Sequence, residues 1–394
     1  MEQPTKRHLR LPIDLFEEKA HPLSQFVADA EMVTLEIPDD YEVVIANPVL
    51  PGEVFAIQRL LTLARSGVPL QVIWSEKMAK KVQGSAPIFP LLAVLLTLQG
   101  ANHELQGASG LDTDIFVAVA RKGISQYRLM SDLFSASQVL LCADSRGQSR
   151  PADLYENATG QLRRREDFET LVIDVLSKQL DTSVKQTNAF RNAAALGVIV
   201  AELFENTDLH GRFDVDGTPL TPDAMRGVAF KRVKITLTGA KGAGKNTPPP
   251  TVDCLEVSVF DTGVGYFSSY TKQELKESTS LDFEWKVLHN CLERHYFAGV
   301  EDKRPSHRAM GLAEVLRALQ ALKGRIDVRT GRLFAYRTFM EGDLQAQMEE
   351  LSSPMAHFAF PRPKMLDVEK KYLAIPSAHE KVIGSAVRVV VPLG

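Results

Sequence analysis

Cysteine is scarce in this chain, and so is any excess of charge of one sign. The three cysteines among 394 residues, Cys142, Cys254 and Cys291, are too few and too scattered for a disulfide framework or a zinc site, and they favour a reducing compartment. A formal net charge of −3 gives no indication of a nucleic-acid partner. Together these two features predict a cytoplasmic protein rather than a secreted or nucleic-acid-binding one.

Long hydrophobic runs are absent as well. The longest, residues 86–98 (APIFPLLAVLLTL), is too short to span a bilayer and is typical of a buried helix. The first sixteen residues contain no apolar segment of the signal-peptide kind, so we expect no membrane insertion. With 44% hydrophobic and 24% charged residues, the chain has the composition of a globular protein of two or three domains.

Strand-like and helix-like segments alternate in the first part of the chain. Residues 41–46 (YEVVIA) and 69–75 (PLQVIWS) predict strands. Between them, residues 52–67 carry apolar side chains at helical spacing and end on a glycine, which predicts a helix with its C-terminal cap. This alternation predicts an α/β regulatory domain over residues 1–150, and the following residues 151–182 are interpreted as a connecting helical segment.

The rest of the chain, residues 183–394, predicts a second domain of the α/β (α+β) class. The elements expected from periodicity are helices over residues 184–209, 281–296 and 311–323, strands over residues 232–238, 254–260 and 386–394, and a hairpin over residues 325–339.

One stretch of this second domain superficially matches a phosphate-binding loop. Residues 239–246, GAKGAGKN, follow a strand-like run and have the G-x-x-x-x-G-K spacing, in which backbone amides and a lysine cradle phosphates. Asn246 stands where the pattern needs a hydroxyl for Mg²⁺, and the prolines at 248–250 cannot open the helix that such a loop requires. We therefore interpret the stretch as a connecting loop between two strands.

Three polar residues lie one turn apart near the end of the long predicted helix, in ELFENTDLHG. Glu202, Asn206 and His210 are four residues apart and project from one side of a helix. A carboxylate one turn from a carboxamide suits phosphoryl chemistry, because Asn can hold hydrated Mg²⁺ through its carbonyl oxygen while Glu polarises an attacking water. The alternative is an exposed polar helix face.

A strand that ends in Asp261 carries the second pattern, VSVFDTGVGYF. A fixed carboxylate at a strand end can accept a hydrogen bond from the exocyclic amine of adenine. Gly263 and Gly265 would let the backbone lie close to the base. The alternative is an ordinary Asp/Gly turn.

The third pattern, SHRAMGLAEVLRALQALKG, opens a helix at Gly311. The free N–H groups at such a start form an anion site suited to phosphates. The expected core face of this helix consists of Leu312, Val315, Leu316, Leu319 and Leu322. Taken by itself, the pattern describes only an amphipathic helix.

In this order, the three patterns resemble the GHKL ATPase family, which includes gyrase, MutL, heat-shock chaperones of the same class, sensor histidine kinases and anti-sigma serine kinases. The later stretches GRIDVRTG and VRVVVPLG match as well, so the resemblance covers about residues 183–394. ELFENTDLHG looks most like the helix of stand-alone anti-sigma-type ATPases. The resemblance implies ATP and Mg²⁺ as ligands and a Bergerat-type two-layer α/β sandwich with a mixed sheet.

The resemblance implies a role for each matching position. Glu202 becomes the candidate general base and Asn206 the Mg²⁺ ligand. Asp261 becomes the adenine anchor, and the segment 266–310 becomes the ATP lid. The other nucleotide-contacting positions that it implies are Gly263 and Gly265 on the base side, His210, the amide of Gly311, and Leu312.

The chain departs from the family in the last glycine-rich box. His307 and Ala309 stand where the family usually has two more glycines. His307 and Arg308 can instead supply positive charge to the phosphates, which is a hypothesis from the residue types. The departure leaves the geometry of the lid, and hence turnover, open.

The first domain resembles a STAS-like regulatory domain in one stretch, VVIANPVLPGEVFAIQRLLTLARSGVPLQVIW, which predicts a strand, a short turn, a helix and a further strand. Such folds accompany GHKL ATPases in bacterial signalling. An unclassified α/β domain is the alternative.

The resemblance implies three possible functions. One is an ATP-hydrolysing conformational switch in a bacterial-type signalling or regulatory system, acting on a protein partner or on a second copy of the chain. Another is a protein kinase of anti-sigma type that phosphorylates a partner, and the third is a non-hydrolysing ATP-binding module. Histidine autophosphorylation has less support, because His103 in NHELQG is best interpreted as a surface or turn residue.

Overall fold

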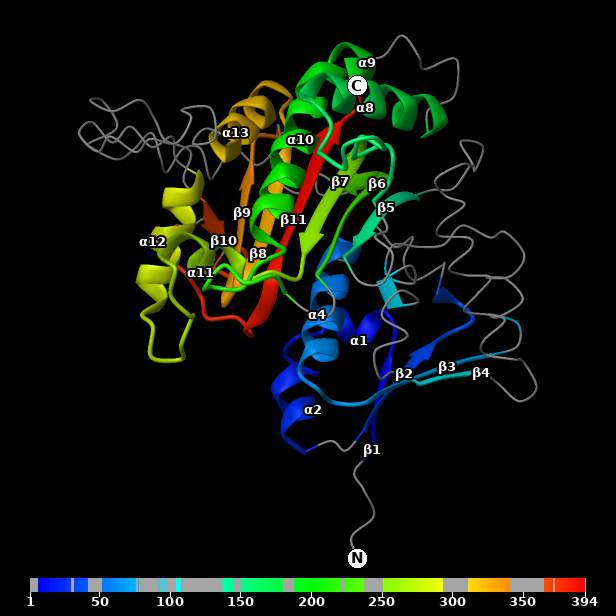
Figure 1. Cartoon of the computed structure of the whole chain (residues 1–394), viewed down its shortest axis with the longest axis vertical. Helices are drawn as coiled ribbons and strands as arrows, with labels where there is room; N and C mark the ends of the chain where they lie inside the picture. Colours follow the sequence, from blue (N-terminus) through cyan, green and yellow to red (C-terminus); the bar gives the residue numbers. More distant parts are fainter. Residues whose placement is uncertain are drawn as a thin grey trace, which may run out of the picture.

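The described residues form two β-sheets with helices around them, which is the mixed α/β (α+β) composition that the sequence predicts. The structure, a computed structural model, describes residues 6–29, 32–41, 52–75, 77, 91, 94–95, 104–107, 137–144, 150–179, 188–220, 224–236, 251–292, 311–340, 365–370 and 373–393. Figure 1 shows helix α10 lying across the larger sheet, and helix α4 between this sheet and the smaller one at the lower right. No helix within these ranges is long and apolar enough to cross a membrane.

The smaller sheet is parallel, with strand order β1-β2-β3-β4. Its elements are β1 (Lys6–Arg10), α1 (Ile13–Phe16), α2 (Leu23–Asp29), β2 (Met32–Ile37), α4 (Glu53–Arg65), β3 (Leu70–Trp74) and β4 (Glu104–Gly107). Parallel strands need a crossover connection, and α4 provides it between β2 and β3. The helix predicted over residues 52–67 is confirmed, and Gly67 has the positive φ of +82° that a helix-ending glycine supplies.

The larger sheet has the strand order β10-β9-β8-β11-β7-β6-β5. Its strands are β5 (Ser137–Ala143), β6 (Met225–Thr236), β7 (Thr251–Asp261), β8 (Arg325–Gly331), β9 (Leu333–Thr338), β10 (Leu366–Asp367) and β11 (Val382–Pro392). The helices of this part are α8 (Arg165–Gln179), α9 (Asn188–Arg191), α10 (Ala193–His210), α11 (Gly265–Thr271), α12 (Leu281–Leu292) and α13 (Gly311–Ala321).

The expectation of a mixed sheet is wrong for the strands that the structure describes, because every pair in the larger sheet is antiparallel. Strands β6 and β7 follow one another in the chain and pair directly, as do β8 and β9, which produces antiparallel neighbours. Strand β11 then inserts between β8 and β7 and runs opposite to both. Parallel pairing is found in the smaller sheet.

The long helix predicted over residues 184–209 is interrupted. The structure has the short α9 and then α10, and Asn192 between them leaves the helical conformation, with φ −96° and ψ 3°. Strand β5 was not predicted at all, yet it forms an edge of the larger sheet by pairing with β6. Residues 137–143 thus lie in the larger sheet although they precede residue 150, and the domain limits remain a prediction.

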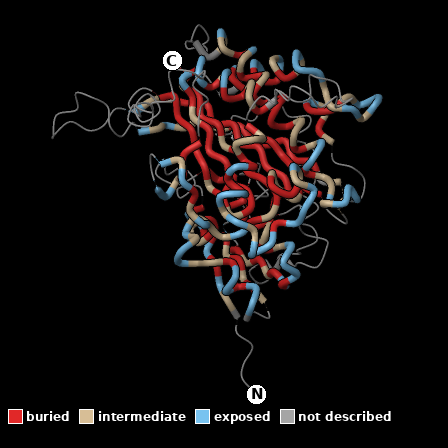
Figure 2. Tube along the Cα trace, turned by 90° about the vertical axis from the view of Figure 1, so that its left-hand side faces the viewer, coloured by how far each residue is buried: buried red, intermediate tan, exposed pale blue. Residues whose placement is uncertain are grey.

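Strand β7 is buried on both faces and forms the centre of the core. Leu255, Val257 and Val259 contribute to one hydrophobic cluster with residues of α8, α10, α12 and α13. Phe260 belongs instead to a cluster that contains α4 and strands of the smaller sheet. Helix α4 therefore covers the opposite face of the larger sheet from α10, and Figure 2 shows buried residues concentrated along the strands.

Polar contacts also join α4 to the larger sheet. The Gln58 side-chain nitrogen donates to the carbonyl oxygens of Arg329, at 3.1 Å, and Ile383, at 3.0 Å. The hydroxyl of Thr62 accepts the Ile383 amide at 3.1 Å. These two side chains provide hydrogen-bond partners for backbone groups of strands β8 and β11. They therefore fix the position of α4 relative to both strands.

A buried carboxyl lies at the start of α4. Oε1 of Glu53 accepts hydrogen bonds from the Leu91 amide at 2.8 Å and the Tyr41 hydroxyl at 3.3 Å. Burial is the main cause that raises the pKa of Glu53 from 4.5 to about 7, and neighbouring Lys231 opposes this shift.

The raised pKa of Glu53 predicts a pH-dependent stability. The folded chain binds the proton more tightly than the unfolded chain, so the stabilisation is complete below pH 4.5 and is lost as the pH rises through about 7. The expected loss is roughly 3 kcal/mol in the free energy of unfolding. Urea unfolding across this pH range should show that the free energy of unfolding no longer falls with pH in Glu53→Gln, whereas it still falls in the exposed-site control Glu274→Gln. The same fall with pH in Glu53→Gln as in the wild type would contradict the raised pKa of Glu53.

Candidate functional site

Asp261 ends strand β7 in the middle of the larger sheet, and only 5% of its surface is exposed. Its Oδ1 accepts the Gly263 amide at 2.8 Å, and its Oδ2 accepts the hydroxyl of Ser385 on the facing strand β11. Burial raises the pKa of Asp261, while these donated hydrogen bonds act in the opposite direction. Both bonds are donated to the carboxylate, which is the arrangement that the ionised form requires.

The backbone after Asp261 is held tightly by strand β11. The Gly384 amide donates to the Gly263 carbonyl oxygen at 2.7 Å, and the pairing of β11 shifts register between Val382 and Ser385. Gly384 has a φ of +60°, and a Cβ at this position would overlap the carbonyl oxygen of Asp261. Close packing of the chain against itself therefore requires glycine here.

The end of helix α10 lies directly against Asp261. Gly211 follows the last helical residue, and a Cβ placed on it would lie 2.5 Å from the Asp261 Cβ. A Cβ on Gly263 would lie 2.6 Å from the Gly211 Cα. The structure therefore brings together the first two sequence patterns, which are about fifty residues apart along the chain.

Glu202 points into the protein and not into solvent, so the alternative of a uniformly exposed helix face does not hold. Its side chain is 6% exposed and forms an ion pair with Arg165, the first residue of α8. Arg165 also contacts Glu314, in the first turn of α13, at 3.0 Å. This ion-pair cluster, Arg165, Glu202 and Glu314, joins three helices.

The other two polar residues of α10 are more accessible. Asn206 is partly buried, and its side-chain nitrogen donates to the Glu202 carbonyl oxygen at 2.8 Å. Since this bond uses the nitrogen, the side-chain oxygen is the atom that suits a magnesium ion. His210 lies at the solvent-exposed end of the helix, where desolvation of its ring and then the charge of Lys272 lower its pKa, which favours the neutral imidazole.

His210 lines a hollow of about 260 Å³ beside the Asp261 turn. The residues around it are Leu209, His210, Phe213, Asp214, Val215, Gly217, Val264, Ser268, Ser269 and Lys272. Its volume is below the range of roughly 300–1,000 Å³ that is usual for small-molecule sites. The hollow alone is therefore too small for a whole nucleotide.

The described part of helix α13 runs from Gly311 to Ala321, and the opening of the helix at Gly311 stays a prediction. The next residue, Leu312, is 7% exposed, and its side chain packs in the same hydrophobic cluster as α10. Any contact of Leu312 with a nucleotide would thus come from its backbone. His307 and Arg308 lie outside the described residues, as do His103 and the GAKGAGKN loop at 239–246.

The first part of the predicted lid is a packed pair of helices. Gly265, with a φ of +76°, begins α11, and the next amide, that of Tyr266, donates to the Thr330 hydroxyl at 3.1 Å. Helix α12 is anchored by Glu284, whose carboxylate pairs with Arg332 at 3.0 Å. The rest of the predicted lid, residues 293–310, falls in a gap of the description.

The sequence patterns did not identify three residues of this region. Ser385 lies opposite Asp261, Arg165 pairs with Glu202, and Glu314 pairs with Arg165. Arg165 belongs to the run RRRED, which the sequence alone does not distinguish from a solvated charged face. No local signal identifies Ser385, because its role depends on strand register.

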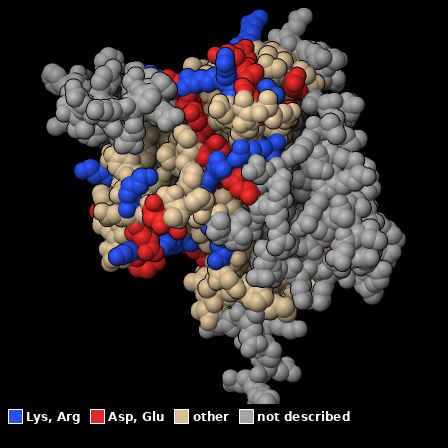
Figure 3. Space-filling view, in the orientation of Figure 1, with Lys and Arg blue, Asp and Glu red and all other residues tan. Residues whose placement is uncertain are grey.

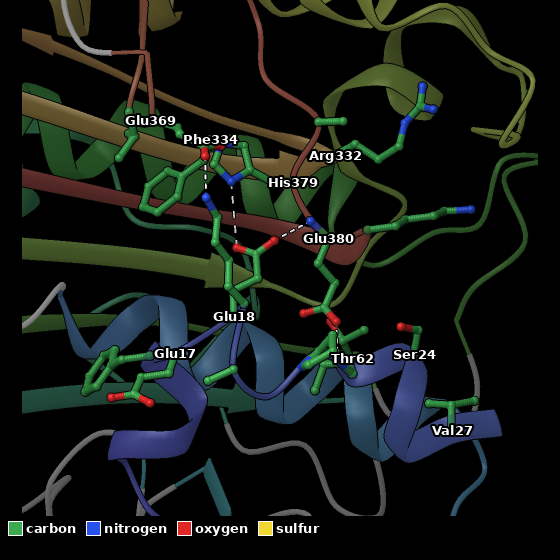
Figure 4. Close-up of a pocket in the computed structure, with 18 of the residues that line it drawn as sticks. Glu17, Glu18, Ser24, Val27, Thr62, Arg332, Phe334, Glu369, His379 and Glu380 are labelled. Carbon is green, nitrogen blue, oxygen red and sulfur yellow. Dashed lines mark hydrogen bonds and ion pairs between the residues drawn. The ribbon is translucent and has the colours of Figure 1, made fainter. Parts of the chain in front are cut away.

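A larger cavity, of about 1050 Å³, lies away from these residues, between the first helices and strand β9 (Figure 4). The described site residues do not line it. Two of its carboxylates are paired with arginines: Glu18 lies 3.1 Å from Arg329, and Glu380 lies 3.1 Å from Arg59. Size alone would favour this cavity, but none of the three sequence patterns contributes a described residue to its lining.

On the face shown in Figure 3, described basic and acidic side chains lie next to one another and do not form separate patches. Within the described ranges, no group of three or more His, Cys, Asp or Glu is arranged to hold a metal ion. A magnesium ion that is held by one side-chain oxygen and by phosphates does not need such a group.

Comparisons with protein-family models, with curated proteins and with solved structures find no match for this chain.

The close crossing at Gly384 predicts a large cost for adding a single methyl group. Gly384→Ala should lower the free energy of unfolding by about 3 kcal/mol or more, because it combines an unfavourable φ with overlap of backbone atoms. Gly217→Ala is the matched control, since Gly217 has a φ of +84° but no atom within 4 Å of the added Cβ. This control should lose only about 1 kcal/mol. Equal losses in urea unfolding would show that the crossing is not tightly packed.

Proposed function

We propose that the chain binds ATP with Mg²⁺ between α10, the end of β7 and the start of α13, and that it hydrolyses the terminal phosphate. The observation that carries this proposal is the convergence of three distant sequence patterns. Gly211 at the end of α10 packs on Asp261, and Arg165 connects Glu202 of α10 with Glu314 of α13. The resemblance to GHKL ATPases supports the same arrangement.

The base would be recognised at Asp261. Its carboxylate is fixed by the Gly263 amide and by the Ser385 hydroxyl, and a carboxylate has further lone pairs for a third donor. The exocyclic amine of adenine is such a donor. A carboxylate that is already oriented loses little freedom on binding, which favours affinity and selectivity.

The phosphates would lie toward α13. The amides of its first turn would attract negative charge, and the side-chain oxygen of Asn206 would coordinate Mg²⁺, which neutralises phosphate charge. Glu202, one turn before Asn206, is the side chain suited to accept the proton of the attacking water. The proposed switch would act on a protein partner or on a second copy of the chain.

A second candidate is a module that binds ATP without hydrolysing it. The ion pair between Glu202 and Arg165 favours this candidate, because a carboxylate held by a guanidinium is a poor proton acceptor. Transfer of the phosphate to a partner protein would use the same binding residues and stays a prediction from the resemblance.

Replacing the base anchor should weaken binding. Asp261→Asn retains the shape but removes the charged acceptor, so we expect Mg-ATP affinity to fall at least tenfold in equilibrium titration. Asp214→Asn is the control, because Asp214 is an exposed acid in the neighbouring hollow and should keep wild-type affinity. Unchanged affinity in a folded Asp261→Asn protein would rule out this anchor.

Glu202→Gln separates binding from hydrolysis. The amide cannot accept a proton from water, so release of phosphate should fall by about 100-fold or more, while Mg-ATP still binds. Glu205→Gln on the same helix is the matched control, because Glu205 is only partly buried, and this variant should keep wild-type activity. If the wild-type protein binds ATP and releases no phosphate, the non-hydrolysing module is the better description.

A further inference from the structure

We propose that Arg165 is the residue by which the site distinguishes ATP from ADP: it pairs with Glu202 in the nucleotide-free chain and turns to the terminal phosphate when ATP binds. This inference rests on the proposed function and adds a phosphate-binding residue that none of the three sequence patterns contains. It also gives the Glu202 ion pair a role, since the pair then restrains the base until the phosphate arrives.

The position of Arg165 makes it available to a phosphate at the start of α13. Its guanidinium contacts Glu314, the fourth residue of that helix, at 3.0 Å. The same guanidinium pairs with Glu202, one turn from Asn206. Arg165 therefore lies between the two elements that would hold the phosphates and the metal ion.

Exposure of the three side chains shows which one can turn. The Arg165 side chain is 44% exposed, while those of Glu314 and Glu202 are 27% and 6% exposed. Arg165 is the first residue of α8, so its long side chain is not enclosed by a preceding helical turn. Glu202 projects from the middle of α10 and stays in place.

Charge balance favours the exchange. The cluster holds two carboxylates and one guanidinium, so its net charge is −1 and an incoming polyphosphate would be repelled unless Arg165 engages it. A guanidinium has five N–H donors and binds phosphate oxygens in the same bidentate manner as carboxylate oxygens. ADP lacks the terminal phosphate and would leave Arg165 on Glu202.

The exchange would release Glu202 at the moment of reaction. The water oxygen then bonds to the terminal phosphorus, the bond to the bridging oxygen breaks with its electron pair remaining on ADP, and the water proton passes to Glu202. Arg165 meanwhile stabilises the negative charge of the phosphoryl group in transfer. Restraint and catalysis are thus performed by one side chain.

The test is equilibrium binding of Mg-ATP and Mg-ADP to four full-length proteins: wild type, Arg165→Ala, Glu202→Gln and the double variant. Arg165→Ala should lower the ratio of ATP to ADP affinity at least tenfold. Glu202→Gln removes the competing carboxylate, so it should bind ATP several-fold more tightly than wild type does, and this gain should vanish in the double variant. Exposed Arg164→Ala is the control and should keep the wild-type ratio.

The outcomes separate the two proposals. If wild type binds no ATP, the proposed function fails, and the role of Arg165 fails with it. If wild type prefers ATP and Arg165→Ala keeps that preference, the role of Arg165 alone is overturned. Because Arg165→Ala leaves a buried carboxylate without its partner, thermal unfolding is recorded for each protein, and the double variant gives the result if the single variant does not fold.

Discussion

The crossing of the Gly384 backbone over Asp261 is the constraint on which the arrangement of this region depends. It requires a glycine with positive φ and a shift in register of strand β11. In return, the Gly384 amide binds the Gly263 carbonyl oxygen, and the next residue, Ser385, delivers its hydroxyl to the Asp261 carboxylate. Burying a carboxylate costs free energy unless hydrogen-bond donors compensate for the lost water. By supplying such a donor, the crossing makes a buried Asp261 at the end of β7 energetically tolerable.

The same segment of β11 connects the site to the first part of the chain. Ile383 exchanges hydrogen bonds with Gln58 and Thr62 of α4, and it immediately precedes Gly384. Helix α4 is buried between the two sheets, so a displacement of the smaller sheet would reach β11 through packed atoms. The network is contiguous from α4 to Asp261, which is the physical arrangement that a regulatory first domain would need.

Local patterns predicted the elements that depend on local chemistry. Helix α4 with its glycine cap, α13 and strand β7 have a clear apolar pattern, and all were found. Strand β1 (KRHLR) and strand β5 were not predicted, because their strand character comes from pairing partners far away in the chain. For the site, spacing along one helix predicted that Glu202 and Asn206 share a face, but only tertiary packing pairs Glu202 with Arg165 and Asp261 with Ser385. Antiparallel order likewise depends on where β11 inserts, which no local pattern records.

The central claim is that a fixed carboxylate at Asp261 selects adenine, and the most direct measurement is equilibrium binding of Mg-ATP and Mg-GTP to the wild-type protein. Adenine presents an amine donor where guanine presents a carbonyl oxygen, which a carboxylate repels. We predict at least a tenfold preference for ATP. Equal affinity for the two nucleotides, or binding of neither, would contradict the assignment of Asp261 as the adenine anchor.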